Sequence, residues 1–216
     1  NERLEFLGDA VIDLAVSLLV AKGWAVPLPA DGVMLTADDN GFINAVAPRD
    51  PVIVTARAED GADGVDALYA YLAGQLNAIL QPAFEALKAH TRYGLRGMWG
   101  QAADQIAAIA ARRSRLLGQD QTQAWRSAAR LTDALSAVQP LIRMRPSAFV
   151  SSWPAGPAMI AVKGTCCLYF KVGEPQDQHR YCSNCPVLPE EGRAPRVAEQ
   201  LRREYGRLYG LEQAVA

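Results

Sequence analysis

The stretch that decides the fold class is residues 65–90, VDALYAYLAGQLNAILQPAFEALKAH. Its large apolar side chains recur every three or four residues, which is the period of an amphipathic helix. The members of this apolar stripe are Leu68, Leu72, Leu76, Ile79 and Leu80. Pro82 interrupts the run, and we expect it to kink or divide the helix, because proline lacks an N–H and its ring clashes with the preceding turn.

Working outward, further segments carry a helical signal. They are residues 2–22, 98–117, 122–138 and 194–209. Gly23 and Gly118 follow the first two of these segments, and Pro140 follows the third, as stop signals. The last segment is rich in arginine and glutamate, and we expect it to be the closing helix.

The remaining chain is punctuated by proline and glycine, which favours turns and short strands. Within residues 25–55 we expect strands at 33–36 and 52–55, and a further strand at 159–162. The predicted fold class is α+β, mostly helical, with a small antiparallel β unit and a loop-rich C-terminal segment. We expect two regions, a helical and mixed domain over residues 1–150 and a C-terminal segment with the closing helix over 151–216.

Composition narrows the function classes. Half of the 216 residues are hydrophobic, about a fifth are charged and the net charge is −1. The chain therefore has no overall basic field to attract nucleic acid or an anionic membrane. Its most apolar stretch, residues 10–21, contains Asp13 and is shorter than the ~20 residues of a spanning helix. We expect a cytoplasmic protein, in which thiols persist as ligands or catalysts and not as disulfides.

All four cysteines lie between Cys166 and Cys185, as an adjacent pair, Cys166 and Cys167, and a Cys-x-x-Cys at Cys182 and Cys185. Cysteines used as core filler show no such clustering, so a shared ligand explains the pattern better. Four thiolates suit either a tetrahedral zinc ion or a [2Fe–2S] cluster. The adjacent pair favours the cluster, because structural zinc sites usually use two Cys-x(2–4)-Cys knuckles. A zinc-stapled binding module and a disulfide pair remain alternatives.

The residues around these cysteines resemble a known family. Residues 164–170, GTCCLYF, and residues 181–186, YCSNCP, are similar to the cluster segment of the FhuF-like ferric siderophore reductases. Residues 97–104, GMWGQAAD, resemble a helix start of the same family. The likeness covers residues 65–190. Fourteen residues separate Cys167 from Cys182, which is longer than the gap typical of the family.

The resemblance implies an iron–sulfur oxidoreductase that reduces the iron of a ferric siderophore from Fe³⁺ to Fe²⁺ for release in the cytoplasm. It implies a C-terminal [2Fe–2S] cluster bound by the four cysteines and an electron donor of the ferredoxin or flavin reductase type. Peripheral association with the siderophore import machinery is a further expectation, and nucleic acid is not a partner. Cations near the cluster would complement an anionic chelate: Lys163, Lys171, Arg180, Arg143 and Arg145.

A competing signature stands at the other end of the chain. Residues 1–10, NERLEFLGDA, resemble the ribonuclease III signature, in which the carboxylates matching Glu5 and Asp9 bind Mg²⁺. These two residues are spaced i, i+4 on one helix face and could share a divalent ion. The nearest later acidic candidate is Glu85, but Pro82 stands where the family has an aspartate. The alternative function is therefore a Mg²⁺-dependent endoribonuclease acting on double-stranded RNA.

Overall fold

The computed structural model describes residues 2–28, 33–37, 43–49, 52–154, 156–171 and 181–206. In that part of the chain the protein is a mostly helical α+β structure, as predicted. The helices are α1 (Glu2–Lys22), α2 (Gly61–His90), α3 (Leu95–Leu116), α4 (Gln121–Val138) and α5 (Glu190–Tyr205). None of the described helices combines the length and apolarity needed to cross a membrane.

The strands pair as three antiparallel two-stranded sheets within the described residues. β1 (Trp24–Ala25) pairs with β4 (Val54–Thr55), and β2 (Val33–Ala37) pairs with β3 (Ile43–Pro48). β5 (Ser147–Trp153) and β6 (Gly156–Val162), each seven residues long, form a hairpin with Ser147 opposite Val162. Short 3₁₀ turns, Ala58–Asp60 and Tyr169–Lys171, precede α2 and follow the first cysteine pair.

The helix ends follow from local chemistry. Asp120 caps α4, where its carboxylate accepts hydrogen bonds from the N–H groups of Thr122 and Gln123, which would otherwise lack partners. Gly118 ends α3 in the left-handed conformation, with φ of 62°, which costs glycine little. Pro82 lies inside α2 and does not divide it, because the apolar stripe buries the helix on both sides of the proline.

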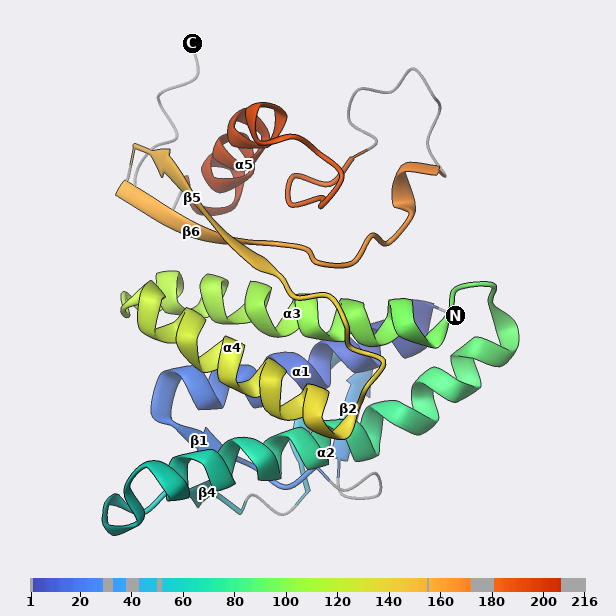
Figure 1. Cartoon of the computed structure of the whole chain (residues 1–216), viewed down its shortest axis with the longest axis vertical. Coiled ribbons are helices and arrows are strands. Elements are labelled where there is room, and N and C mark those ends of the chain that lie inside the picture. The colour runs from blue at the N-terminus through green and yellow to red at the C-terminus, as the bar shows by residue number, and fades with distance from the viewer. Residues whose placement is uncertain are drawn as a thin grey trace.

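The main core lies between α1, α2, α3 and α4, with α3 at its centre (Figure 1). Trp99 of α3 is fully buried and contacts Phe84 of α2 edge to face, with ring centroids 4.9 Å apart. A second apolar cluster joins the hairpin to α5. Its members are Trp153, Ala158, Val197, Leu201 and Tyr205. The hairpin and α5 therefore form a layer on the face of α3 that is turned away from α2.

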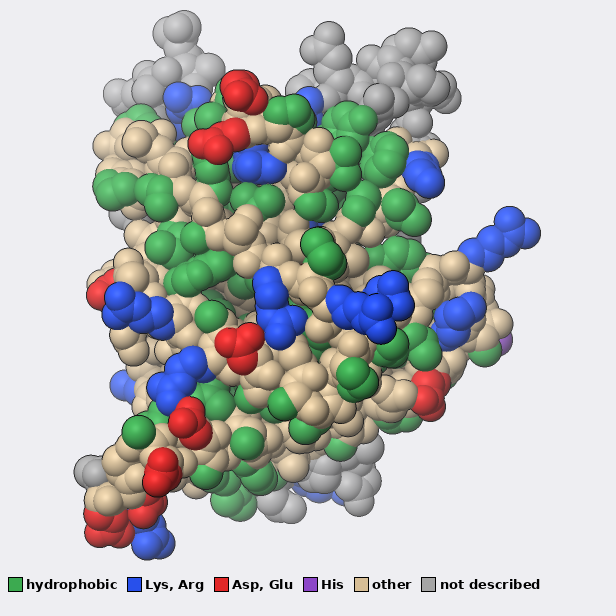
Figure 2. Space-filling model, in the orientation of Figure 1, with side chains coloured by type: hydrophobic (Ala, Val, Ile, Leu, Met, Phe, Trp, Pro, Cys, Tyr) green, Lys and Arg blue, Asp and Glu red, His purple; other side chains and the backbone are tan. Residues whose placement is uncertain are grey.

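Surface charge is mixed, in keeping with the net charge of −1. Figure 2 shows lysine and arginine side chains in a band across the middle of one face, with acidic side chains between and below them. Several basic residues are paired, as Arg130 is with Asp66 at 2.5 Å and Arg145 with Asp133 at 3.3 Å. This face carries no continuous field of one sign.

Candidate metal centre

Two loops of the upper layer bring one cysteine of each pair together. Cys166 and Cys167 follow β6, and Cys182 and Cys185 lie in the turn that precedes α5. The N–H of Lys163 donates to the carbonyl of Asn184 at 3.0 Å, which joins the two loops. The sulfur atoms of Cys167 and Cys182 lie 3.9 Å apart, although 15 positions separate them in the chain.

The Cys-x-x-Cys turn is held by its own backbone. The N–H of Cys185 donates to the carbonyl of Cys182 at 3.1 Å, and the carbonyl of Cys185 accepts from the N–H of Leu188 and from the guanidinium of Arg193. Cys185 is buried, with 4% of its surface exposed, whereas the other three cysteines are half-buried. The turn thus fixes one cysteine in the interior and leaves Cys182 facing the first loop.

The first loop contains a strained residue. Leu168 has φ of 61°, which a non-glycine residue seldom adopts, and its side chain is 40% exposed. The N–H of Leu168 lies 3.4 Å from the sulfur of Cys166, and its carbonyl accepts from the N–H of Lys171. Strained backbone persists where the surrounding structure holds it, often at functional sites. In this conformation the backbone N–H of Leu168 points toward the sulfur of Cys166.

The cysteines and Lys163 affect the pKa values of two side chains at this site. Burial raises the pKa of Cys182, and the nearby Cys167 and Cys185 raise it further, while Lys163 lowers it. Burial likewise raises the pKa of Tyr93 to about 12, and Cys167 and Cys166 add to that rise. The thiolate of Cys182 is therefore disfavoured where it stands, and a bound cation would stabilise it.

These residues fit an iron–sulfur cluster in number and kind. All four are free thiols, and two thiolates on one tetrahedral metal with bonds of ~2.3 Å lie ~3.8 Å apart, close to the spacing of Cys167 and Cys182. A [2Fe–2S] cluster takes its thiolates as two pairs, one on each iron. Within the described ranges, no three His, Cys, Asp or Glu side chains gather around one point that could hold a metal ion.

Helix α3 docks the first cysteine loop through a buried carboxylate. Asp104, 3% exposed, accepts from the N–H of Gly164 at 2.7 Å and from the N–H of Thr165 at 3.0 Å. Burial raises the pKa of Asp104 to about 6, although both hydrogen bonds and the charge of Lys163 lower it. The carboxylate thus holds the two residues that immediately precede Cys166.

Two further side chains complete this attachment. Gln101 donates to the carbonyl of Thr165 at 2.9 Å and accepts from the ammonium of Lys163 at 3.1 Å. The hydroxyl of Tyr93 donates to the carbonyl of Cys166 at 3.1 Å. Every residue from Lys163 to Cys166 therefore has a polar bond to α3 or to the turn that leads into it.

Two close approaches leave no room for larger residues. A Cβ added at Gly100 would lie 2.1 Å from Oγ1 of Thr165, and one added at Gly97 would lie 2.5 Å from the ring of Tyr93. The close approach of α3 to the loop depends on Gly100, whereas Gly97 makes room for the ring of Tyr93 in the turn before the helix. The segment 97–104 and the segment 164–170, which the sequence singled out separately, thus lie against each other.

The five basic residues that the sequence predicted near the cluster differ in position and in their partners. Lys163 lies beside the cysteines, where its charge lowers the pKa of Cys182. Lys171 and Arg143 are exposed, and Arg145 pairs with Asp133 and donates to the carbonyl of Ile142. Arg180 lies outside the described residues.

The candidate residues of the alternative ribonuclease function are Glu5, Asp9 and Glu85. Glu5 and Asp9 belong to α1, but their side chains lie outside the described part of the structure. Glu85 is exposed on α2 and accepts a hydrogen bond from Gln81, one turn earlier. Among the described residues, Glu85 belongs to no group of three His, Cys, Asp or Glu side chains that could hold a metal ion.

Sequence reasoning assigned no role to Tyr93, Gln101 or Asp104. Asp104 could have been identified from its position in an alanine-rich helix. A single carboxylate among residues that are expected to be buried needs hydrogen-bond partners. Tyr93 carried no comparable signal, because its partner lies 73 positions away.

In comparisons with known proteins, no family model, no curated protein and no solved structure matches this chain.

Proposed function

We propose that this protein is an iron–sulfur oxidoreductase that reduces the iron of ferric siderophores, with Cys166, Cys167, Cys182 and Cys185 as the cluster ligands. The observation that carries the proposal is the 3.9 Å approach of the Cys167 and Cys182 sulfur atoms across two separate loops. The docking of the first loop on α3 supports it, because binding sites need a rigid supporting shell.

The bound [2Fe–2S] cluster supplies one-electron transfer, in which an external donor of the ferredoxin or flavin reductase type gives up one electron and one chelated Fe³⁺ becomes Fe²⁺. Siderophores hold Fe³⁺ through hard anionic oxygen donors, which bind Fe²⁺ less tightly, so the metal is released and the chelator survives. No side chain has to act as a nucleophile or general base in this reaction. We place it in the cytoplasm, with peripheral association with the siderophore import machinery.

The chain's own residues set the conditions at the sulfur atoms. Lys163 offsets part of the negative charge that four thiolates bring to the site. The N–H of Leu168 is positioned to donate to Cys166, and such bonds to sulfur raise a cluster's reduction potential. Cys185 is buried while Cys167 and Cys182 are half-buried, so the proposed cluster would face solvent on one side, where a substrate can approach.

The test is anaerobic purification followed by metal, sulfide and absorption analysis. We expect a reddish-brown protein with about two irons and two sulfides per chain, whose visible absorption bleaches on reduction. Adding a ferric trihydroxamate chelate should restore the absorption and release Fe²⁺ to a ferrous-specific indicator. Cys182→Ser should remove the colour, and Ser183→Ala, in the same turn, should keep it. A colourless protein with stoichiometric zinc would contradict the proposal and favour the zinc-stapled module.

A further inference from the structure

The sulfur atoms of Cys167 and Cys182 are close enough to react with each other. They lie 3.9 Å apart, and both residues are free thiols. A disulfide bond is about 2.05 Å long, so the two atoms have to approach by a distance that a rotamer change of either side chain covers. Among the described residues, this is the one hydrogen-bonding contact between two cysteine sulfur atoms.

The other two cysteines are held by their own loops. The N–H of Leu168 lies 3.4 Å from the sulfur of Cys166, within the first loop. Cys185 is buried, with 4% of its surface exposed, and its N–H donates to the carbonyl of Cys182 at 3.1 Å. One cysteine of each pair is therefore held within its own loop, and the other contacts the opposite loop.

The two loops are held against each other by contacts of the main chain. The N–H of Lys163 donates to the carbonyl of Asn184 at 3.0 Å. The buried carboxylate of Asp104 binds the N–H groups of Gly164 and Thr165 and so fixes the first loop on α3. Reacting groups that are held close together in this way react at a high effective concentration. The sulfur atoms therefore meet because the fold holds both loops in place.

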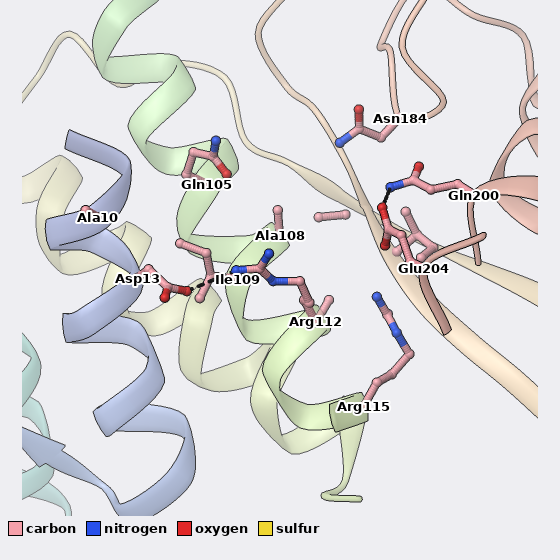
Figure 3. Close-up of a pocket in the computed structure, with 13 residues that line it drawn as sticks. Ala10, Asp13, Gln105, Ala108, Ile109, Arg112, Arg115, Asn184, Gln200 and Glu204 are labelled. Carbon is pink, nitrogen blue, oxygen red and sulfur yellow. Dashed lines mark hydrogen bonds and ion pairs between the residues drawn. The ribbon is translucent and has the colours of Figure 1, made fainter. Parts of the chain in front are cut away.

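The reactive pair is accessible to a small molecule. Cys167 and Cys182 are half-buried, in contrast to the buried Cys185. Figure 3 shows the side chain of Asn184, which stands between Cys182 and Cys185 in the chain, directed from the C-terminal layer toward α3 across a cleft of about 590 Å³. The turn that carries Cys182 therefore borders an open cleft.

We infer that Cys167 and Cys182 form a reversible disulfide in the metal-free chain, by exchange with a small-molecule disulfide of the glutathione type. One cysteine thiolate attacks a sulfur of the small disulfide, which forms a mixed disulfide and releases one small thiolate. The second cysteine thiolate attacks the cysteine sulfur of the mixed disulfide, which closes the S–S bond of the protein and releases the second small thiolate. The two cysteines are oxidised, and the small disulfide is reduced to two thiols that take up the two protons lost by the cysteines.

This disulfide and a metal centre exclude each other. The bond removes one thiolate from each cysteine pair and leaves Cys166 and Cys185, so a site of four thiolates cannot form. This consequence rests on the proposed function, in which all four sulfur atoms bind the cluster. Disulfides of cytosolic proteins are usually transient and often redox-sensing. The redox state of Cys167 and Cys182 would thus control whether the cluster is loaded.

The experiment uses the full chain, freed of metal by a chelator under reducing conditions and then incubated with oxidised glutathione. Trypsin cleaves on both sides of each cysteine pair, after Lys163, Lys171, Arg180 and Arg193. The two pairs therefore fall on separate peptides, 164–171 and 181–193. We expect the free thiols to fall from four to about two and the two peptides to be cross-linked until dithiothreitol is added.

Serine variants and fragment-ion spectra identify the bonded pair. The cross-link should be lost in Cys167→Ser and in Cys182→Ser, and it should be kept in the matched controls Cys166→Ser and Cys185→Ser. Fragment-ion spectra of the cross-linked peptides of the unchanged chain give the same assignment without any variant. Before dithiothreitol is added, the oxidised chain should take up no iron or sulfide.

The outcomes separate this inference from the proposed function. A bond within one peptide, such as Cys182 to Cys185, or an unchanged thiol count, would overturn the inference even where the reduced chain takes up iron and sulfide. A cross-linked chain that still takes up iron and sulfide would overturn control of loading by the disulfide. A cross-link in a chain that binds zinc and no cluster once reduced would support the disulfide and refute the reductase.

Discussion

The carboxylate of Asp104 and the N–H of Gly164 meet at 2.7 Å, although 60 positions separate them in the chain. The same carboxylate accepts from the N–H of Thr165, and Asp104 is buried while Gly164 and Thr165 are half-buried. This contact joins the helical core to the cysteine loop.

Asp104 should make stability depend on pH. Its pKa rises from 3.8 to about 6 on folding, so the folded chain holds the proton more tightly and this contribution is fully present below about pH 4. It is lost as pH rises through about 6, by about 3 kcal/mol in total. We expect the free energy of unfolding of the reduced, metal-free chain, relative to Asp104→Asn, to fall between about pH 4 and pH 7. Urea titrations that give parallel pH profiles for the two proteins would refute this.

Gly100 should tolerate no side chain. A methyl group there would overlap the Thr165 side chain, with all three closest atoms within 2.9 Å, so Gly100→Ala should cost about 1–3 kcal/mol and reduce cluster content. Thr165→Gly removes the obstructing atoms and should restore much of the loss in the double variant. Gly74→Ala is the control, because nothing lies within 4 Å of a Cβ there and alanine favours helix. Equal thermal stability of Gly100→Ala and the unchanged protein would contradict the close approach.

The hydroxyl of Tyr93 should be the part of this side chain that holds the loop of Cys166 in place. Tyr93→Phe removes the hydrogen bond to the carbonyl of Cys166 and should lower the free energy of unfolding by about 1 kcal/mol. The cluster should also be lost faster to an iron chelator, because the loop opens more often. Tyr71→Phe, a half-buried tyrosine of α2 with no hydroxyl bond in the described part of the chain, is the control. Identical loss rates in the two variants would remove Tyr93 from the anchor.

Pro82 should be a local weakness of α2. The helix continues through it, yet proline cannot donate to the carbonyl one turn earlier, so Pro82→Ala should stabilise the protein by about 1–3 kcal/mol. Denaturant unfolding measures the change. A decrease in stability would instead mean that the packing of Phe84 on Trp99 requires the proline at this point.

The helices were predictable because most carry an apolar period of their own, and three are followed by a stop residue. The stripe from Leu68 to Leu80 is buried or half-buried as expected, and Gly23 and Gly118 end their helices with positive φ. The closing helix starts at Glu190 and not at the expected residue 194, because two glutamates favour a helix start and Pro195 does not prevent one. Strand β5 was missed altogether, and its partner β6 begins at Gly156 and not at the expected residue 159.

The candidate site was predictable only in part. The clustering of the four cysteines in sequence predicted that they lie in one region, and the structure places the sulfur atoms of Cys167 and Cys182 3.9 Å apart. The anchor from Tyr93, Gln101 and Asp104 spans 60 or more positions, and no local pattern encodes such a distance.

The fit of Gly100 under Thr165 also constrains how this chain can have diverged. A side chain at position 100 requires a smaller residue at position 165, whereas Thr165 can become smaller while Gly100 stays as it is. The order of change is therefore fixed, with position 165 changing before position 100. Relatives that carry a side chain at position 100 should also carry a residue smaller than threonine at position 165.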